Sequence, residues 1–323
     1  MNEVIDKLLN SNEPSIQLKV LINLLGKDPR SKECEKARTA VKSSSKVKLI
    51  LSERDNHGKI PYHPYKKWYG AHWVLVSLAD LGYPSSDVNL IPLREQVYKW
   101  LFSEKHEKSI KNINGRVRRC ASQEGNALYS LLTLGLADEK TEELAERLKS
   151  WRWPDGGWNC DRNPHAIHSS FMESLIPLRA LALHAREKQN KESRDTSKAA
   201  AEIFLKRNLY KRQKDGKVMK DDFLKLHFPC YWHYDILFGL KVMTEVGYIN
   251  DTRCQDALDL LESKKLSDGG FPAEKKYYQV TNKMKGGRSL VNWGGTSKRK
   301  MNEFVTVDAL WVLKEASRIS INL

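Results

Sequence analysis

The sequence predicts an all-α protein whose helical hairpins close into an α/α toroid, and three observations carry this prediction. Apolar helical segments recur along the 323 residues, amphipathic segments alternate with them, and turns with Asn or Asp before Gly separate the units. That residue pairing tolerates the positive φ of tight turns. No long segment shows the two-residue period of a strand, and no linker divides the chain. We therefore expect one domain over residues 1–323, with about five to six hairpins.

The apolar segments are predicted to form the inner helices of the toroid, because they are apolar on most faces. They span residues 72–82, 125–135, 171–182, 234–247 and 304–316. The amphipathic segments each keep one polar face and are predicted to form the outer helices, at residues 95–105, 141–151, 197–209 and 254–266.

Two regions depart from this simple alternation. Residues 1–53 contribute an N-terminal helical pair, from segments 15–26 and 36–53, ahead of the repeat array of residues 54–323. Residues 272–302 are long and irregular, which favours a loop that lies over one rim of the toroid.

The chain is strongly basic, with 55 Lys and Arg against 40 Asp and Glu, a net charge of +15. Such a charge attracts polyanions, but no nucleic-acid-binding motif accompanies it, so a nucleic-acid partner is unsupported. The longest apolar run is too short to cross a bilayer, and the N-terminus lacks the apolar core of a signal peptide. Five scattered cysteines suit a reducing compartment, and we expect a cytoplasmic protein.

Two segments carry a family resemblance. WRWPDGGWNCD (151–161) and LSDGGFPAE (266–274) each follow an amphipathic helix and resemble the prenyltransferase and squalene-oxidase repeat. The stretches 64–84 and 286–314 are similar to squalene-cyclase-like bacterial proteins of unassigned activity. The resemblance covers nearly the whole chain. It implies the toroid of terpenoid cyclases and protein prenyltransferases, with an isoprenoid or another apolar ligand, phosphorylated or not, in a central cavity.

The catalytic motifs of that superfamily are absent. The chain has no D-x-D-D tetrad, and around Asp221 and Asp222 the D-D-x-x-D motif fails because Lys225 holds its last position. The Asp-x-Cys pair of zinc-dependent prenyltransferases is missing too. Whether the protein is an enzyme is left open by these departures.

Three polar residues hold equivalent positions at the start of successive inner helices: His168, His233 and Glu303. In a toroid these positions ring one mouth of the cavity, where helix N-termini favour an anion. With Asp161 they are the candidate catalytic acids and bases. The alternative is that each side chain caps its own helix.

Aromatic and basic residues near the repeat turns are candidate ligand contacts. Rings of this kind can stabilise a carbocation, stack on a sugar, or pack one repeat on the next. A glycine-rich turn flanked by bases can hold a phosphate. The candidates are Trp158, Tyr231, Trp232, Tyr234, Trp293, Arg288, Lys298 and Arg299.

Two pairs of metal-ligand types recur at three-residue spacing, which makes zinc the candidate cofactor. The candidate ligands are Cys160, His165, His168, Cys230 and His233.

Two further functions stay open beside the terpenoid reading. One is a non-catalytic toroid that binds a ligand or a macromolecule through its mouth and basic surface. The weaker one is a carbohydrate-active α/α-barrel enzyme, for which two separated carboxylates such as Asp161 and Glu303 would be needed.

Overall fold

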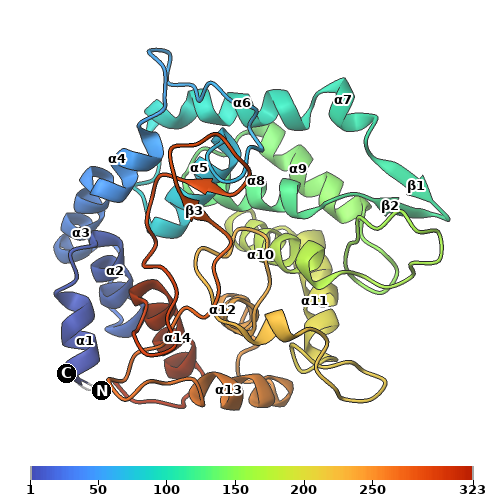
Figure 1. Cartoon of the computed structure of the whole chain (residues 1–323). Coiled ribbons are helices and arrows are strands. Elements are labelled where there is room, and N and C mark those ends of the chain that lie inside the picture. The colour runs from blue at the N-terminus through green and yellow to red at the C-terminus, as the bar shows by residue number, and fades with distance from the viewer. Residues whose placement is uncertain (1, 322–323) are drawn as a thin grey trace.

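The prediction of a mostly helical protein is confirmed by a computed structural model that describes residues 2–321 (Figure 1). Strands within this range are limited to two short ladders. One is a hairpin of β1 (Lys111–Ile113) and β2 (Arg116–Arg118), and the other pairs β3 (Gln279–Val280) with β4 (Arg288–Ser289) in parallel.

The helices fall into an inner and an outer set. The inner helices are largely buried: α2 (Pro14–Lys19) with its π-helical continuation Val20–Leu24, α5 (Ala71–Leu81), α8 (Ser122–Thr133), α10 (Phe171–Glu187), α12 (Ile236–Glu245) and α14 (Glu303–Glu315). The outer helices are α1 (Asn2–Leu9), α3 (Lys32–Ser43), α4 (Ser45–Leu51), α6 (Ile91–Leu101), α7 (Glu104–Glu107), α9 (Glu139–Ser150), α11 (Lys191–Leu205) and α13 (Gln255–Glu262).

The inner helices pack in a ring. Each of α5, α8, α10, α12 and α14 contacts the next, and α14 contacts α2 and its π-helical continuation. The ring closes where α5 ends, because Gly82 lies so near α2 that a Cβ there would be 2.9 Å from Leu18. Gly82 also has a φ of +75°, which ends the helix in a left-handed cap.

The repeated D-G-G turn is built identically at both of its sites. Trp153 N–H donates to the Gly157 carbonyl, and Leu266 N–H donates to the Gly270 carbonyl. Each turn is then tied to the following inner helix by a hydroxyl. Ser174 Oγ accepts from Trp158 N–H at 3.0 Å, and Thr306 Oγ1 accepts from Phe271 N–H at 2.9 Å. The two D-G-G segments of the sequence are therefore one structural unit used twice.

The interior of the ring is polar toward the C-terminal ends of its inner helices. Asp308 on α14 accepts from Lys241 on α12 at 2.7 Å and from Lys19 on α2 at 3.3 Å. Arg179 on α10 pairs with Glu245 on α12 at 2.6 Å, and its guanidinium lies 3.8 Å from the centre of the Tyr129 ring. These buried ion pairs place charged groups inside the ring. An apolar ligand there could not form hydrogen bonds with those groups.

The opposite mouth of the ring is filled by aromatic side chains. Trp68 stacks on Tyr231 with ring centres 3.9 Å apart, and His233 lies on Tyr277 at 3.4 Å. The irregular segment 272–302 crosses this mouth, in front of α5 in Figure 1, and Trp68 Nε1 donates to the Tyr277 carbonyl at 2.6 Å. We call this set of stacked rings the aromatic plug.

The void that the plug leaves, lined by Trp68, Tyr231 and Trp293 among others, has a volume of about 20 Å³. That space suits one water molecule, whereas ligand pockets occupy about 300–1,000 Å³. The expectation of an isoprenoid cavity at this mouth is therefore wrong, because the aromatics predicted to line it stack on one another instead. A cavity of about 740 Å³ lies at the other end of the ring, lined by residues of α8, α10, α12 and α14.

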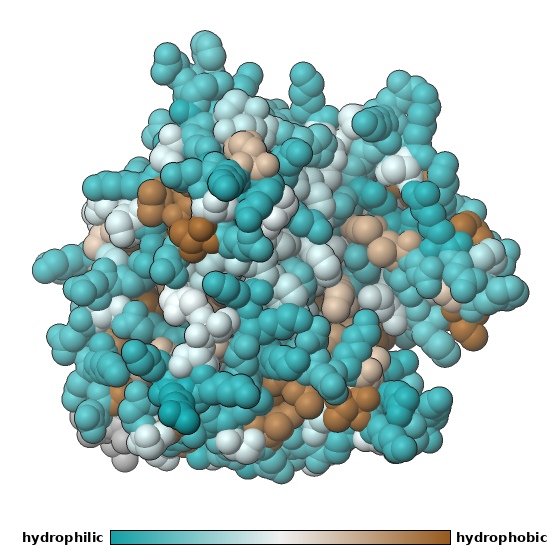
Figure 2. Space-filling model, in the orientation of Figure 1, coloured by the Kyte–Doolittle hydropathy of each residue, from teal (hydrophilic) through white to brown (hydrophobic). Residues whose placement is uncertain are grey.

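Hydrophilic residues predominate on the face seen in Figure 2, and apolar residues form small, separate patches there. Across residues 2–321, no helix combines the length and the apolar character needed to cross a membrane.

Candidate functional site

A cavity of about 540 Å³ lies to one side of the aromatic plug, between the segment before α5, the helices α6 and α7, and the start of α8. We call it the side cavity. Its lining residues are His63, Pro64, Tyr65, Gln96, Lys99, Trp100, Ser103, Lys105, His106, Ser109, Arg119 and Gln123.

The wall of the side cavity is aromatic. Trp100, at the end of α6, lies with its ring centre 5.1 Å from Tyr65 and 5.4 Å from His106. Tyr65 reaches this wall because its segment folds back at Gly70, where a Cβ would be 2.3 Å from the Pro64 carbonyl oxygen. Only glycine allows that close approach, so the turn before α5 sets the position of Tyr65.

The floor of the cavity is a hydrogen-bonded polar group around Arg119. His106 Nε2 lies 2.6 Å from the buried Glu124 carboxylate, and Arg119 Nη2 lies over the edge of the same ring, 2.8 Å from Nε2 and 3.1 Å from Nδ1. Arg119 also donates to Gln123 Oε1, and to Ser109 Oγ at 3.2 Å. The His106 ring thus lies between Glu124 and Arg119 and helps to hold the Arg119 guanidinium in place.

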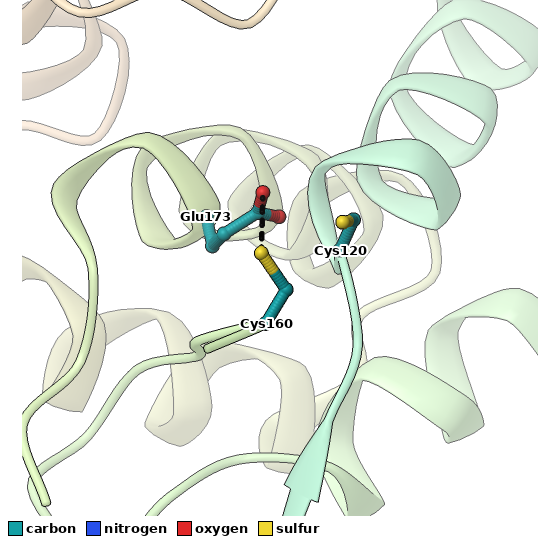
Figure 3. A group of neighbouring side chains, drawn as sticks. All are labelled: Cys120, Cys160 and Glu173. Atoms are coloured by element: carbon teal, nitrogen blue, oxygen red, sulfur yellow. Dashed lines mark hydrogen bonds between the residues drawn. The ribbon is translucent and has the colours of Figure 1, made fainter. Parts of the chain in front are cut away.

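Behind the cavity lies a cluster of two thiols and a carboxylate: Cys120, Cys160 and Glu173 (Figure 3). Cys120 precedes α8, Cys160 follows the first D-G-G turn, and Glu173 sits in the first turn of α10. Cys160 Sγ lies 3.6 Å from Glu173 Oε1, and Glu173 Oε2 accepts from Ser122 N–H at 3.0 Å. Burial raises the pKa of the Glu173 carboxyl. The hydrogen bond from Cys160 lowers the pKa of the Cys120 thiol.

The cluster and the side cavity are neighbours. Burial raises the pKa of the Tyr65 phenol, and the charges of Glu173 and Cys120 add to that effect. The chain also joins the two, because Arg119 lines the cavity and the next residue, Cys120, belongs to the cluster.

The three predicted catalytic rim residues have separate surroundings. His168 is exposed in the loop after the first D-G-G turn, and His233 is buried in the aromatic plug. Glu303 lines a different cavity, of about 650 Å³, and accepts from Ser11 Oγ at 2.9 Å. The expected convergence on one rim is wrong. His168 and His233 lie in the loops before α10 and α12, whereas Glu303 is the first residue of α14, and the chain takes a different path before each helix. Asp161 is also exposed, and its carboxylate accepts from Asn163 N–H within its own loop.

The predicted ligand-binding aromatics are mostly packing residues. Trp158 is buried and donates to the Leu148 carbonyl, and Tyr234 donates to the Leu209 carbonyl. Tyr231 stacks on Trp68 and Trp232 on His233, both within the plug.

The predicted basic contacts and Trp293 are divided between two places. Arg288 is held in a double hydrogen bond to Glu53, so its charge is neutralised. Trp293 and Arg299 line the same cavity as Glu303, and Lys298 is exposed outside that lining. A role for any of these residues in ligand binding stays a prediction.

The predicted zinc ligands are not assembled. His165 and His168 are exposed, whereas Cys230 Sγ lies 3.9 Å from the His227 carbonyl oxygen on another segment. Among the residues that the structure describes, the cluster that brings three metal-ligand atoms together joins Cys160 to Cys120 and Glu173 instead.

The residues that form the site had one signal in the sequence. Glu124 and Glu173 are lone acids at the start of otherwise apolar inner helices, where a buried charge needs partners. Arg119 and Cys120 directly precede the helix of Glu124, but His106 and Cys160 lie on other segments, so no single local spacing links the set.

No family model and no curated protein matches the chain. Among solved structures, the chain is similar to one described as a glycosyl hydrolase family 88 protein from Bacteroides vulgatus. The two share 13% sequence identity at a TM-score of 0.48, over 95% of this chain and 91% of the other.

The resemblance to terpenoid cyclases and prenyltransferases is wrong: no family model supports it, and a similar solved structure is described as a glycosyl hydrolase family 88 protein. The D-G-G turns on which the resemblance was based have a local explanation in the backbone conformation of glycine. Gly156 and Gly269 have φ of +110° and +82°, a conformation open to glycine wherever such a turn precedes an inner helix, whatever the protein does.

Proposed function

We propose that the side cavity binds an acidic saccharide. The observation that carries the proposal is its lining, which combines an aromatic wall with amides, hydroxyls and three cations and includes no Asp or Glu. The volume of about 540 Å³ is in the range of small-molecule sites.

The wall and the floor of the side cavity would contact different parts of a saccharide. The exposed faces of Trp100 and Tyr65 offer flat apolar surfaces on which the C–H face of a sugar ring can pack. Gln96, Ser103 and Ser109 offer donors and acceptors for hydroxyl groups at the same time. This mixture suits a polyol ring better than a purely apolar ligand.

The charge of the cavity selects for an anion. Lys99 and Lys105 are exposed at its edge, and within residues 2–321 neither lies within ion-pair distance of a carboxylate. Arg119 is held in place at the floor by His106, Gln123 and Ser109, so its ordering entropy is already lost before a ligand arrives. A carboxylate or sulfate on the sugar would meet the charges of the two lysines and the remaining N–H donors of Arg119, whose guanidinium lies 3.6 Å from the buried Glu124 carboxylate.

The proposal is for recognition rather than glycoside cleavage. Cleavage needs two carboxylates that flank the bond. The sequence-predicted pair does not provide them, because Asp161 lies in an exposed loop and Glu303 lines a different cavity.

Calorimetric titration with a uronic acid and with its neutral parent hexose tests the proposal, because the two ligands differ in one carboxylate. We expect the uronic acid to bind about tenfold more tightly or better at low salt, and the difference to shrink as salt screens the cations.

Lys105→Gln should weaken uronic-acid binding several-fold and leave hexose binding unchanged, while Lys108→Gln is the matched control. Lys108 is exposed one turn away and does not line the cavity. Equal affinity for the two sugars, or binding of a nucleoside monophosphate and neither sugar, would overturn the proposal.

A further inference from the structure

We propose that Cys120, Cys160 and Glu173 form a binding site for a thiophilic divalent metal of the zinc class, with three protein ligands and an open fourth position. The inference is independent of the saccharide proposal, since it rests on different side chains and is tested by metal content rather than by sugar binding.

The geometry already matches metal coordination. One ligand atom from each residue lies within 4.8 Å of the other two. Around a tetrahedral zinc with bonds of about 2.3 Å to sulfur and about 2.0 Å to oxygen, sulfur and oxygen ligands stand about 3.5 Å apart and two sulfurs about 3.8 Å apart. The observed separation between Cys160 Sγ and Glu173 Oε1 is 3.6 Å. The ligands could close on an ion with little movement.

Three separate segments hold the ligands in place. Figure 3 shows the side chains pointing toward one another from the start of α8, the loop after the first D-G-G turn and the first turn of α10. The Ser122 amide binds one carboxylate oxygen of Glu173 at 3.0 Å, which leaves Oε1 directed at Cys160. A fixed outer partner of this sort is what orients carboxylate ligands in metal sites.

The charge balance of the cluster also favours a cation. Glu173 is a buried carboxylate, and no Lys, Arg or His of the described residues lies within ion-pair distance of it. Its remaining contacts are a thiol and one backbone amide. Buried charges in proteins are paired or bind metal, and two adjacent cysteines make a soft cation the suitable partner.

A disulfide between the two cysteines is the competing use of the pair. All five cysteines are free in this structure. The Glu173 carboxylate favours the metal, because it can supply a third ligand to an ion and has no part in a disulfide.

The first experiment adds Co²⁺ to the whole protein under reducing conditions. The absorption spectrum of bound Co²⁺ depends on its ligands. We therefore expect a thiolate-to-cobalt charge-transfer band together with the intense visible bands of a tetrahedral site. One equivalent of Zn²⁺ should displace the Co²⁺ and remove these bands. Absence of the charge-transfer band would overturn the proposal without reference to any variant.

The second experiment measures zinc by elemental analysis in purified variants. The wild type should hold about one equivalent, Cys120→Ser and Cys160→Ser should lose it, and Glu173→Gln should bind at least tenfold more weakly. Cys230→Ser is the matched control and should keep its zinc, because Cys230 lies outside the cluster. Thermal unfolding confirms that each variant is folded.

Two results would overturn the site. Zinc that stays in the Cys120→Ser, Cys160→Ser double variant would place the metal elsewhere. A disulfide between Cys120 and Cys160 that mass spectrometry finds in protein purified with reductant would show that the pair serves redox chemistry instead.

Discussion

The aromatic plug and the side cavity are built from the same residue types at the same end of the helical ring, yet one is solid and the other is open. In the plug, Trp68 stacks on Tyr231 and His233 stacks on Tyr277, and the void beside Trp68 and Tyr231 is only about 20 Å³. In the side cavity, Trp100 and Tyr65 meet at a tilt and border about 540 Å³.

The difference comes from the irregular segment 272–302. It contributes Tyr277 to the plug and anchors itself through Arg288 on Glu53, whereas no residue of this segment lines the side cavity. Aromatic composition near a mouth therefore does not identify a binding site, because a covering segment can convert a lined cavity into packed core.

The largest effect should come from emptying the plug. Trp68→Ala removes a buried ring stacked on Tyr231 and a hydrogen bond to the Tyr277 carbonyl, and we expect it to lower the free energy of unfolding by about 3–5 kcal/mol. Denaturant unfolding measures this loss. A cost below about 1 kcal/mol would show that the plug is not packed core.

The second effect is a dependence of stability on pH. Burial, helped by the charges of His227 and Lys67, lowers the pKa of His233 from 6.5 to about 3. The folded protein therefore keeps this ring neutral while the unfolded chain takes up a proton below pH 6.5. Stability is full above pH 6.5 and falls as the pH drops toward 3, by about 2 kcal/mol for this group at pH 5.

His233→Phe keeps a ring in the stack and removes the titration. The loss of unfolding free energy between pH 7.5 and pH 5 should be smaller in this variant by about 2 kcal/mol. His168→Phe is the control, because His168 is exposed and should leave the pH dependence unchanged. An equal pH dependence in wild type and His233→Phe would contradict a buried, neutral His233.

A third, smaller effect, on sugar affinity, distinguishes the side cavity from the aromatic plug. Trp100→Ala should weaken uronic-acid binding about tenfold, which is about 1.4 kcal/mol, because the sugar loses its stacking surface. Trp100 is half-buried, so its loss should cost less stability than the loss of Trp68. Calorimetry and denaturant unfolding on both variants compare the losses of sugar affinity and of stability. If Trp68→Ala lost more sugar affinity than Trp100→Ala, the assignment of the two regions would be reversed.

The smallest effect is expected at the sequence-predicted rim. Lys298 is exposed and lines neither the side cavity nor the cavity of Glu303. Lys298→Gln should change stability by less than about 0.5 kcal/mol and leave uronic-acid affinity unaltered. A loss of affinity at Lys298 matching that of Lys105→Gln would move the anion site to segment 272–302.

The sequence by itself determined the helical ring and its repeated turn, because both depend on local rules. The spacing of apolar residues sets the buried face of each inner helix, and glycine supplies the positive φ at Gly156 and Gly269. The hydrogen bond from each turn to its inner helix, through Ser174 and Thr306, was found only in the structure.

Only the tertiary structure decided where an open site lies and which residues share it. His168, His233 and Glu303 align in sequence, but the loops before their helices differ, so an equal position in the repeat gives three different environments. Cys120, Cys160 and Glu173 meet because α8, α10 and the loop between α9 and α10 pack together, and Arg119 is oriented by a histidine on another segment. Contacts between distant segments follow from the packing of the whole ring, and no spacing within one segment encodes them.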